Sequence, residues 1–335
     1  MANHSGRGMG WLRDQPDIRD YWIEIGKPAS RQTKKTSSKK GRLSGKSELK
    51  LETTPSPTLS SVADSVGKLK FPYPPPAKHL ANVKWCSPVE DQGALGSCTA
   101  QAGVGLFEYY QRRFSGTHVD GSRRFVYKAT RNLLGWTGDT GAYCRTTMAT
   151  IALLGVALED YWPYTVADPD FDEEPPAFVY ALAENYKGLI YHRIDAMGAS
   201  LPTLTRIKIL ISVGWPAMFG FTCYESLFDS PVGQTGEIPW PVSGERRVGG
   251  HAVVAVGYDD NKKISNNRIG GVETTGAFLI RNSWGTNWGV IPPSAPAGTS
   301  RGYGWLPYKY LEQGQATDWW SLTKAEWIPT EGFSL

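Results

Sequence analysis

A cysteine stands where a flexible loop gives way to a long helical pattern, and this arrangement limits the folds open to the chain. Small residues and glycines lead from Asp91 to Cys98, and apolar residues at helical spacing follow to about Phe114. A helix that begins at Cys98 turns its unpaired N–H groups and positive dipole end toward the sulfur, which favours thiolate over thiol. Gln92, six residues upstream, can donate a hydrogen bond near the sulfur. A nucleophile beside a neutral donor is half of an acyl-transfer site.

The other half lies downstream, in two strand-like blocks. His251 heads an apolar run that ends at Tyr258, and Asn282 follows a second apolar run. A thiolate needs a base, and the base needs a hydrogen-bond partner on its other ring nitrogen. Cys98, His251 and Asn282 therefore supply nucleophile, base and orienting group, in that order along the chain.

Together these blocks resemble the papain family of cysteine peptidases. The resemblance rests on the loop before Cys98, on 251–258 and on the Asn-Ser-Trp-Gly-x-x-Trp-Gly run of 282–289, and it extends over roughly 80–320. Thr99 after the cysteine, where many relatives have tryptophan, is similar to bacterial-type members with short prodomains. The resemblance implies an α+β, papain-like fold with a helical left domain, an antiparallel β-barrel-like right domain and the active-site cleft between them.

For the chemistry, the resemblance implies a cysteine endopeptidase acting through a thioester. Cys98 would attack the peptide carbonyl, His251 would act as acid and base, and Asn282 would orient it. Gln92 and the Cys98 N–H would hold the oxyanion. We expect a Cys98 thiolate pKa of about 3–5, set by His251 and the helix N-terminus.

The substrate-binding residues expected from the resemblance are mostly glycines. Gly138 and Gly141 would form an edge that pairs with the substrate backbone, although an ordinary turn between helices is the alternative. Gly249 and Gly250 leave the pocket wall beside the histidine bare. Trp284 would lie at the same site and shield the Asn282–His251 hydrogen bond from water.

The chain divides into three parts. Residues 1–27 are too apolar for a free tail and either pack on the surface or form a pro-segment near the cleft. Residues 28–79 form a basic, Ser- and Pro-rich linker, which we interpret as a flexible tether rather than a site for nucleic acid or acidic lipid. The peptidase occupies 80–335, with a helical half at about 98–205 and a β half at about 206–335.

Periodicity predicts the main elements of both halves. Helices are expected at about 98–114, 124–134 and 146–154, and strands at 217–224, 251–258, 276–282 and 302–307, with a closing strand at 317–322. The stretches 260–275 and 290–300 look like insertions.

Charge and cysteine content exclude several classes of protein. Residues 31–50 carry eight Lys or Arg and one Glu; since the whole chain carries +4, the remainder carries −3 and is no basic nucleic-acid binder. Four cysteines are too few for a disulfide scaffold. The family bridge that uses a cysteine three residues before the nucleophile is absent, because Leu95 stands there. A Cys86–Cys144 bridge and buried free thiols remain alternatives.

Other motifs are missing or lack their context. The Gly-x-Ser-x-Gly run of 298–302 is not flanked by a strand and a helix, so it predicts no serine hydrolase. No phosphate loop or metal-binding motif occurs, and we expect no cofactor or metal and no nucleic-acid partner. The N-terminus resembles no secretory signal, and no apolar run is long enough to span a membrane.

Three functions are compatible with these residues. The first is peptide hydrolysis, with a protein or peptide substrate and with the chain's own N-terminal segment as an inhibitor. The second is a binding module without turnover, which the intact Cys98 disfavours. The third is acyl transfer to an amine by the same site.

Overall fold

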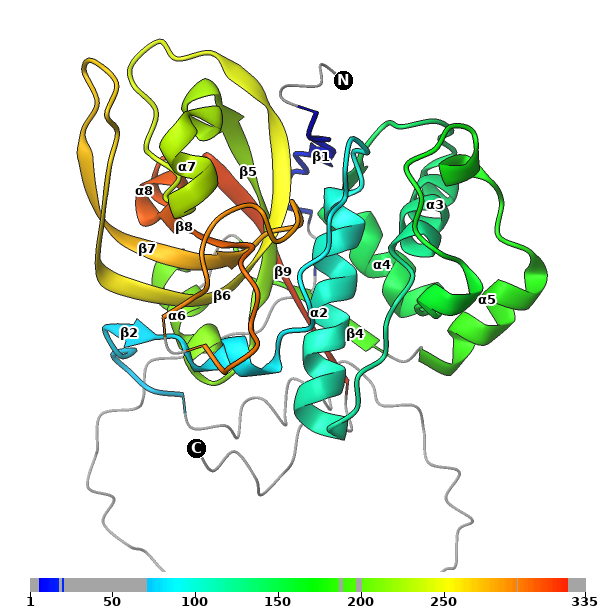
Figure 1. The fold of residues 1–335 in the computed structure, drawn as a ribbon. Helices are drawn as coiled ribbons and strands as arrows, with labels where there is room; N and C mark the ends of the chain where they lie inside the picture. Colours follow the sequence, from blue (N-terminus) through cyan, green and yellow to red (C-terminus); the bar gives the residue numbers. More distant parts are fainter. Residues whose placement is uncertain are drawn as a thin grey trace, which may run out of the picture.

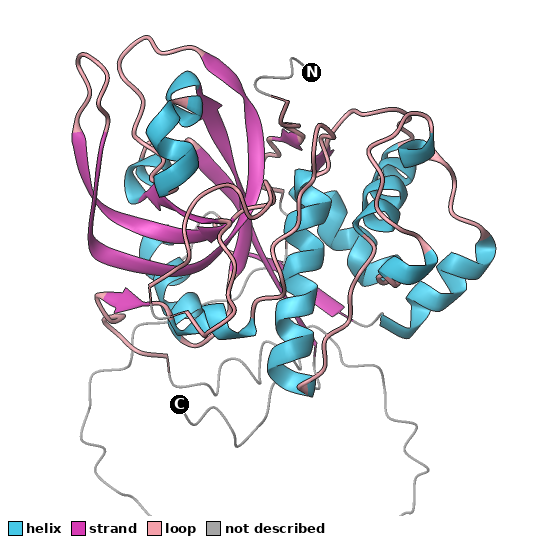
Figure 2. Cartoon of the chain, viewed as in Figure 1, coloured by secondary structure: helices cyan, strands magenta, loops and turns pink. Residues whose placement is uncertain are grey.

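The computed structural model describes residues 6–17, 20, 71–186, 189–196, 201–293 and 295–324. A helical half and a strand half stand side by side, as Figures 1 and 2 show. The architecture is the expected α+β class. The helical half contains α2 (Cys98–Ser115), α3 (Arg123–Leu134), α4 (Cys144–Leu154) and α5 (Ala177–Ala183).

The helices end where the sequence supplies glycine. α2 stops at Gly116 (φ 67°) and α3 at Gly135 (φ 70°), both in the left-handed region that glycine adopts without strain. At the start of α3, the Ser122 hydroxyl accepts a hydrogen bond from the Phe125 N–H at 3.1 Å, as N-cap residues do. α4 begins at Cys144, two residues earlier than the sequence predicts.

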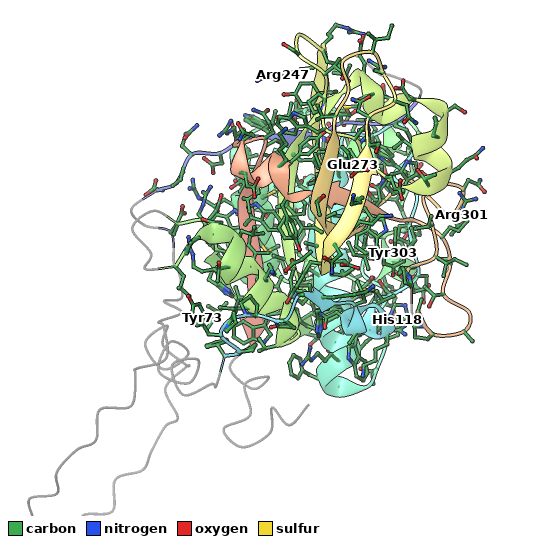
Figure 3. The ribbon with its side chains drawn as sticks, turned by 90° about the vertical axis from the view of Figure 1, so that its left-hand side faces the viewer. Tyr73, His118, Arg247, Glu273, Arg301 and Tyr303 are labelled. Atoms are coloured by element: carbon green, nitrogen blue, oxygen red, sulfur yellow. The ribbon has the colours of Figure 1, made fainter. Side chains whose placement is uncertain are left out.

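The strand half is built on one antiparallel sheet in the order β4-β9-β5-β6-β7-β8, with β2 paired to β6. Its strands are β2 (Lys78–His79), β4 (Leu189–Arg193), β5 (Ala217–Tyr224), β6 (Arg247–Ser265), β7 (Glu273–Arg281), β8 (Tyr303–Pro307) and β9 (Ala316–Lys324). In the view of Figure 3, Arg247 at the start of β6 lies at the end of the molecule opposite Tyr73 and His118.

Three boundaries differ from the sequence prediction. The supposed insertion 260–275 is the outer part of the β6–β7 hairpin, paired from Lys263–Thr275 to Ser265–Glu273. β4 falls in the predicted helical half but pairs with β9 in the sheet. The predicted linker 28–79 reaches too far, because Lys78 and His79 already pair with β6.

Short elements complete the described part of the chain. They are β1 (Trp11–Leu12), β3 (Ala142–Tyr143), α6 (Thr203–Ser212), α7 (Ser230–Thr235), α8 (Tyr308–Glu312) and the 3-10 turns Ala81–Trp85, Glu159–Tyr161, Asp170–Asp172, Glu184–Tyr186 and Glu225–Phe228.

The core lies between α2 and the sheet. Phe219 of β5 stacks on Trp319 of β9 with ring centroids 3.8 Å apart, and Trp319 and Trp320 are both fully buried. The closing strand is therefore core, as its sequence indicates. All four cysteines are free thiols, so the Cys86–Cys144 bridge is not formed.

The N-terminal segment enters between the two halves. β1 pairs in parallel with β3, with Trp11 opposite Ala142 and Leu12 opposite Tyr143. Figure 1 shows β1 between the strand half and α2. Residues 1–5, 18–19 and 21–27 of the predicted pro-segment and the basic run 34–50 lie outside the described residues.

Candidate active site

His251 and Asn282 meet in the buried space between the strands that carry them. His251 Nε2 lies 2.7 Å from Asn282 Oδ1, and because an amide oxygen only accepts, Nε2 carries the proton. Trp284 stacks on the imidazole with centroids 4.6 Å apart and covers this hydrogen bond. Nδ1 has no hydrogen-bond partner among the described residues, so it is free to exchange a proton. The ring is thereby fixed in orientation and tautomer.

Cys98 is the first residue of α2 and is fully buried. Backbone N–H groups of Ala252, Gly10 and Thr99 face its sulfur. Ala252 follows His251 on β6, so the thiol lies at the stretch of β6 that carries the histidine. Helix and sheet thus bring together the two groups that the sequence separates by more than 150 residues.

Gln92 is held in one orientation by a residue that the sequence analysis did not single out. The Ser283 hydroxyl donates to Gln92 Oε1 at 2.7 Å, and the Gln92 N–H donates to the Ser283 carbonyl at 2.9 Å. The amide nitrogen Nε2 is consequently turned the other way, where it donates to the carbonyls of Leu95 at 2.8 Å and Gly8 at 3.1 Å. In the sequence, the position of Ser283 directly after Asn282 was the signal that could have indicated its place at the site.

The N-terminal segment covers the site with its backbone. Gly8 donates to the Gly93 carbonyl at 3.1 Å, and the Gly10 carbonyl accepts from Ala142 at 2.7 Å. A Cβ at Gly8 would lie 1.9 Å from the Leu95 carbonyl oxygen, and one at Gly10 would lie 1.6 Å from the Gly96 carbonyl oxygen. Only glycine permits so close an approach.

Three of the four glycines expected at the substrate site contact this segment. A Cβ at Gly141 would lie 2.2 Å from the Gly10 carbonyl oxygen, while Cβ atoms at Gly249 and Gly250 would strike Met9 and Trp11. Gly138 differs: its N–H donates to Asp172 Oδ2, and a Cβ there would meet open space. Gly138 thus forms contacts within the helical half and not with the N-terminal segment.

The low thiolate pKa expected for Cys98 is not found in this arrangement. Burial raises the pKa of Cys98 to about 11, and burial lowers the pKa of His251 to about 4 against the raising effect of its bond to Asn282. Both groups are therefore neutral at pH 7. The physical reason is desolvation, which disfavours each charged form and here outweighs the helix N-terminus.

Charged residues anchor the segment beyond Leu12. Arg145 at the start of α4 pairs with Asp14 at 2.7 Å and holds both Asp20 oxygens, at 2.8 and 2.9 Å. Arg193 of β4, only 1% exposed, adds a contact to Asp20 at 3.2 Å. The sequence analysis missed these pairs, and single charges spread over the chain gave no signal for them.

The described residues contain neither a candidate metal site nor a candidate membrane span. No group of three or more His, Cys, Asp or Glu side chains in that part of the chain is placed to hold a metal ion. None of its helices combines the length and apolarity that crossing a membrane requires.

Comparison with known proteins points to one family. The profile described as "Papain family cysteine protease" matches residues 76–291. An uncharacterized peptidase C1-like protein of Acanthamoeba polyphaga mimivirus is 30% identical, over 94% of this chain and 86% of its own. Cathepsin K of Gallus gallus is 28% identical over 61% of this chain and 53% of its own.

A solved structure extends the similarity to the N-terminal part. Xylellain, a cysteine protease from Xylella fastidiosa, superposes with a TM-score of 0.65 at 27% identity, covering 97% of this chain and 98% of its own.

Proposed function

This chain belongs to the papain family of cysteine proteases, and on that premise we propose that it is a cysteine endopeptidase held as a zymogen by residues 6–20. The observation that carries the proposal is the convergence of four groups on one buried spot: Cys98 at the start of α2, the oriented His251–Asn282 pair, and the Gln92 amide. The contacts of the N-terminal segment with the same groups support the second part.

The proposed reaction has two halves. His251 Nδ1 takes the proton of the Cys98 thiol, the sulfur attacks a peptide carbonyl carbon, and the carbonyl oxygen gains negative charge that Gln92 Nε2 and the Cys98 N–H stabilise. The C–N bond then breaks, and His251 gives its proton to the departing amine. A water molecule, deprotonated by His251, attacks the resulting thioester; the C–S bond breaks, and the acid product leaves.

Gln92→Ala is expected to lower kcat by roughly 10²-fold, the usual loss for one oxyanion donor. Because Gln92 contacts the oxygen only as charge develops, KM should change little. The measurement is steady-state hydrolysis of a fluorogenic peptide by a chain whose cleft has been opened by Trp11→Ala. A change confined to KM would contradict the oxyanion role.

Ser283→Ala is a useful companion, because Ser283 orients the amide without reaching the reacting atoms. It should reproduce part of the loss in kcat. Gln315→Ala, which removes a glutamine bonded to Tyr224 away from the catalytic cysteine, is the matched control and should leave kcat unchanged.

Inhibition by the N-terminal segment follows from what it occupies. The Gly8 carbonyl takes the hydrogen bond of Gln92 Nε2 that an oxyanion needs. The Gly10 N–H faces the sulfur and blocks the approach of a carbonyl carbon. Since the segment belongs to the same chain, its effective concentration is in the millimolar range for a tether of this kind, so weak contacts suffice to close the cleft.

The double change Asp14→Asn and Asp20→Asn should raise peptidase activity several-fold. It removes the carboxylates that Arg145 and Arg193 hold. The partly exposed Asp14–Arg145 pair alone contributes roughly 0.2–1 kcal/mol. The measurement is the initial rate of peptide hydrolysis by the full-length chain at low salt. Glu273→Gln, which breaks an exposed ion pair on the outer β6–β7 hairpin, is the control. Equal rates for all three chains would remove the anchoring role.

A further inference from the structure

Trp11 fills a buried space, here called the slot, over two glycines of β5 and β6 beside the catalytic histidine. Its indole lies against β5 and β6, where a Cβ at Gly220 would come within 1.9 Å of Trp11 Cε2 and one at Gly250 within 2.7 Å of Cε3. The two glycines lie on neighbouring strands, opposite Ala252 and Thr222 respectively. Any larger residue at either position would take the space of the ring, so the slot admits a flat group.

A buried carboxylate closes the slot. Trp11 Nε1 donates to Asp318 Oδ2 at 3.3 Å, and Asp318 is fully buried. Its other oxygen, Oδ1, accepts from Trp320 Nε1 at 2.9 Å and lies 3.4 Å from Arg193. One oxygen is therefore committed to the protein body, while the other faces the N-terminal segment.

The backbone at Asp318 is also unusual. Among the described residues, Asp318 is the non-glycine residue with a positive φ, at 67°. This conformation is uncommon for residues with a Cβ, and such strain persists where surrounding structure enforces it, often at functional sites. Asp195 enforces it here, because its carboxylate accepts the N–H groups of Asp318 at 2.8 Å and Trp319 at 3.1 Å.

Charge around the slot leaves Asp318 able to act as an anion. Burial raises the pKa of Asp318 to about 6, so the carboxylate is mostly ionised at neutral pH. Arg193 is shared between Asp195, Asp20 and Asp318. A cation entering the slot would therefore meet a carboxylate that a single arginine neutralises only in part.

We propose that Asp318 sets the preference of this slot and selects substrates whose side chain there is flat and ends in an N–H donor. Arginine fits best, because its planar guanidinium can lie over the two glycines and pair with the carboxylate. Tryptophan fits second, as Trp11 demonstrates, and leucine fills the slot without a donor. This inference rests on the proposed peptidase function and names its substrate class.

Position 11 offers a probe that needs no turnover. In the full-length chain, Trp11→Arg should keep the slot filled, whereas Trp11→Leu should loosen the segment and expose Cys98. Alkylation of Cys98 by iodoacetamide, quantified by peptide mass spectrometry, reports this opening. We expect the Trp11→Leu chain to be alkylated roughly 10–100 times faster than the Trp11→Arg chain, because a hydrogen bond to a charged group contributes a factor of that size.

Asp318→Asn provides the second arm of the experiment. Adding it to each position-11 variant should raise the alkylation rate of the Trp11→Arg chain and leave that of the Trp11→Leu chain unchanged, so that the ratio falls below about 3. Equal alkylation of the Trp11→Arg and Trp11→Leu chains with Asp318 intact would overturn the proposal. That comparison holds even if the Asp318→Asn chain does not fold.

Hydrolysis by the Trp11→Ala chain tests the substrate preference directly. The substrates are sets of peptides in which one position near the cleaved bond carries arginine, tryptophan or leucine. At one of these positions kcat/KM should fall in the order arginine, tryptophan, leucine. Cleavage without such an order would overturn the proposed preference of the slot while leaving the peptidase intact. Absence of cleavage together with the expected alkylation pattern would instead refute the proposed function and leave the slot as the binding site for the segment alone.

Discussion

Cys98→Ala should reduce peptide hydrolysis at least about 10⁴-fold, because every later step needs the thioester that the sulfur forms. In the proposed mechanism the remaining groups cannot substitute, because Gln92 would stabilise charge and His251 would only move protons. The comparison is best made in the Trp11→Ala background, where the cleft is open. The rate of hydrolysis of a fluorogenic peptide is then divided by the concentration of folded protein. Alanine is a good helix former, so α2 should still begin at residue 98 and the thermal unfolding midpoint of the protein should not change.

Cys86→Ala is the matched control for this experiment. Cys86 is the C-cap residue of η1, the 3-10 turn Ala81–Trp85, and its thiol lies 3.8 Å from the Asn82 carbonyl oxygen. It takes no part in the site. The control chain should hydrolyse peptide at the parent rate. Residual activity above the 10⁻⁴ level in the Cys98→Ala chain, after contaminating protease is excluded with a class-specific inhibitor, would show that the nucleophile is another residue.

The sequence carries stronger local signals for the candidate site than for its surroundings, and the residues show why. Cys98, His251, Asn282 and Gln92 each stand in a local block whose neighbours fix the backbone, and their roles need particular side chains in a particular order. The helix starts follow from similar local signals. These features are short-range, so one sequence is enough to read them.

The missed features depend on tertiary structure. In the outer β6–β7 hairpin burial alternates around Ile264, but most residues are polar. The sequence there therefore lacks the alternation of apolar and polar residues that predicts a half-buried strand. β4 is only five residues long and gains its place by pairing with β9. The aromatic N-terminal segment predicts docking, but Gly8 and Gly10 specify where it docks only once Leu95 and Gly96 are in place.

The sequence prediction was wrong about the charge state of Cys98 and His251, and for the same reason. A helix N-terminus and a neighbouring histidine favour a thiolate in water, and both are readable from the sequence. Desolvation by burial in the folded chain is not readable from the sequence, and it reverses the direction of the pKa shift for Cys98 and His251. The occluded chain thus holds a neutral thiol and a neutral imidazole.

Trp11→Ala should open the cleft and raise peptidase activity by roughly 10²–10³-fold, since truncating a buried tryptophan costs about 3–5 kcal/mol of docking energy. Trp11 is 7% exposed and carries the segment's side-chain bond to Asp318, so its loss leaves the backbone contacts of Gly8 and Gly10 to hold the segment alone. Trp85→Ala, which removes a half-buried tryptophan of η1, controls for the loss of an aromatic residue and should leave the rate unchanged.

The same substitution should change how Cys98 reacts with pH. In the parent chain the thiol pKa lies near 11, so the thiolate fraction at pH 5–8 is small and the alkylation rate should rise about tenfold per pH unit. In the Trp11→Ala chain water reaches both groups; the pKa of Cys98 falls, that of His251 rises, and the ion pair becomes the stable form between the two values. Alkylation should then be fast and nearly flat across pH 5–8, and His251→Ala should restore the steep dependence. If the Trp11→Ala chain kept the parent's slope while gaining activity, the segment would block substrate alone and the thiolate would have to form only after substrate binds.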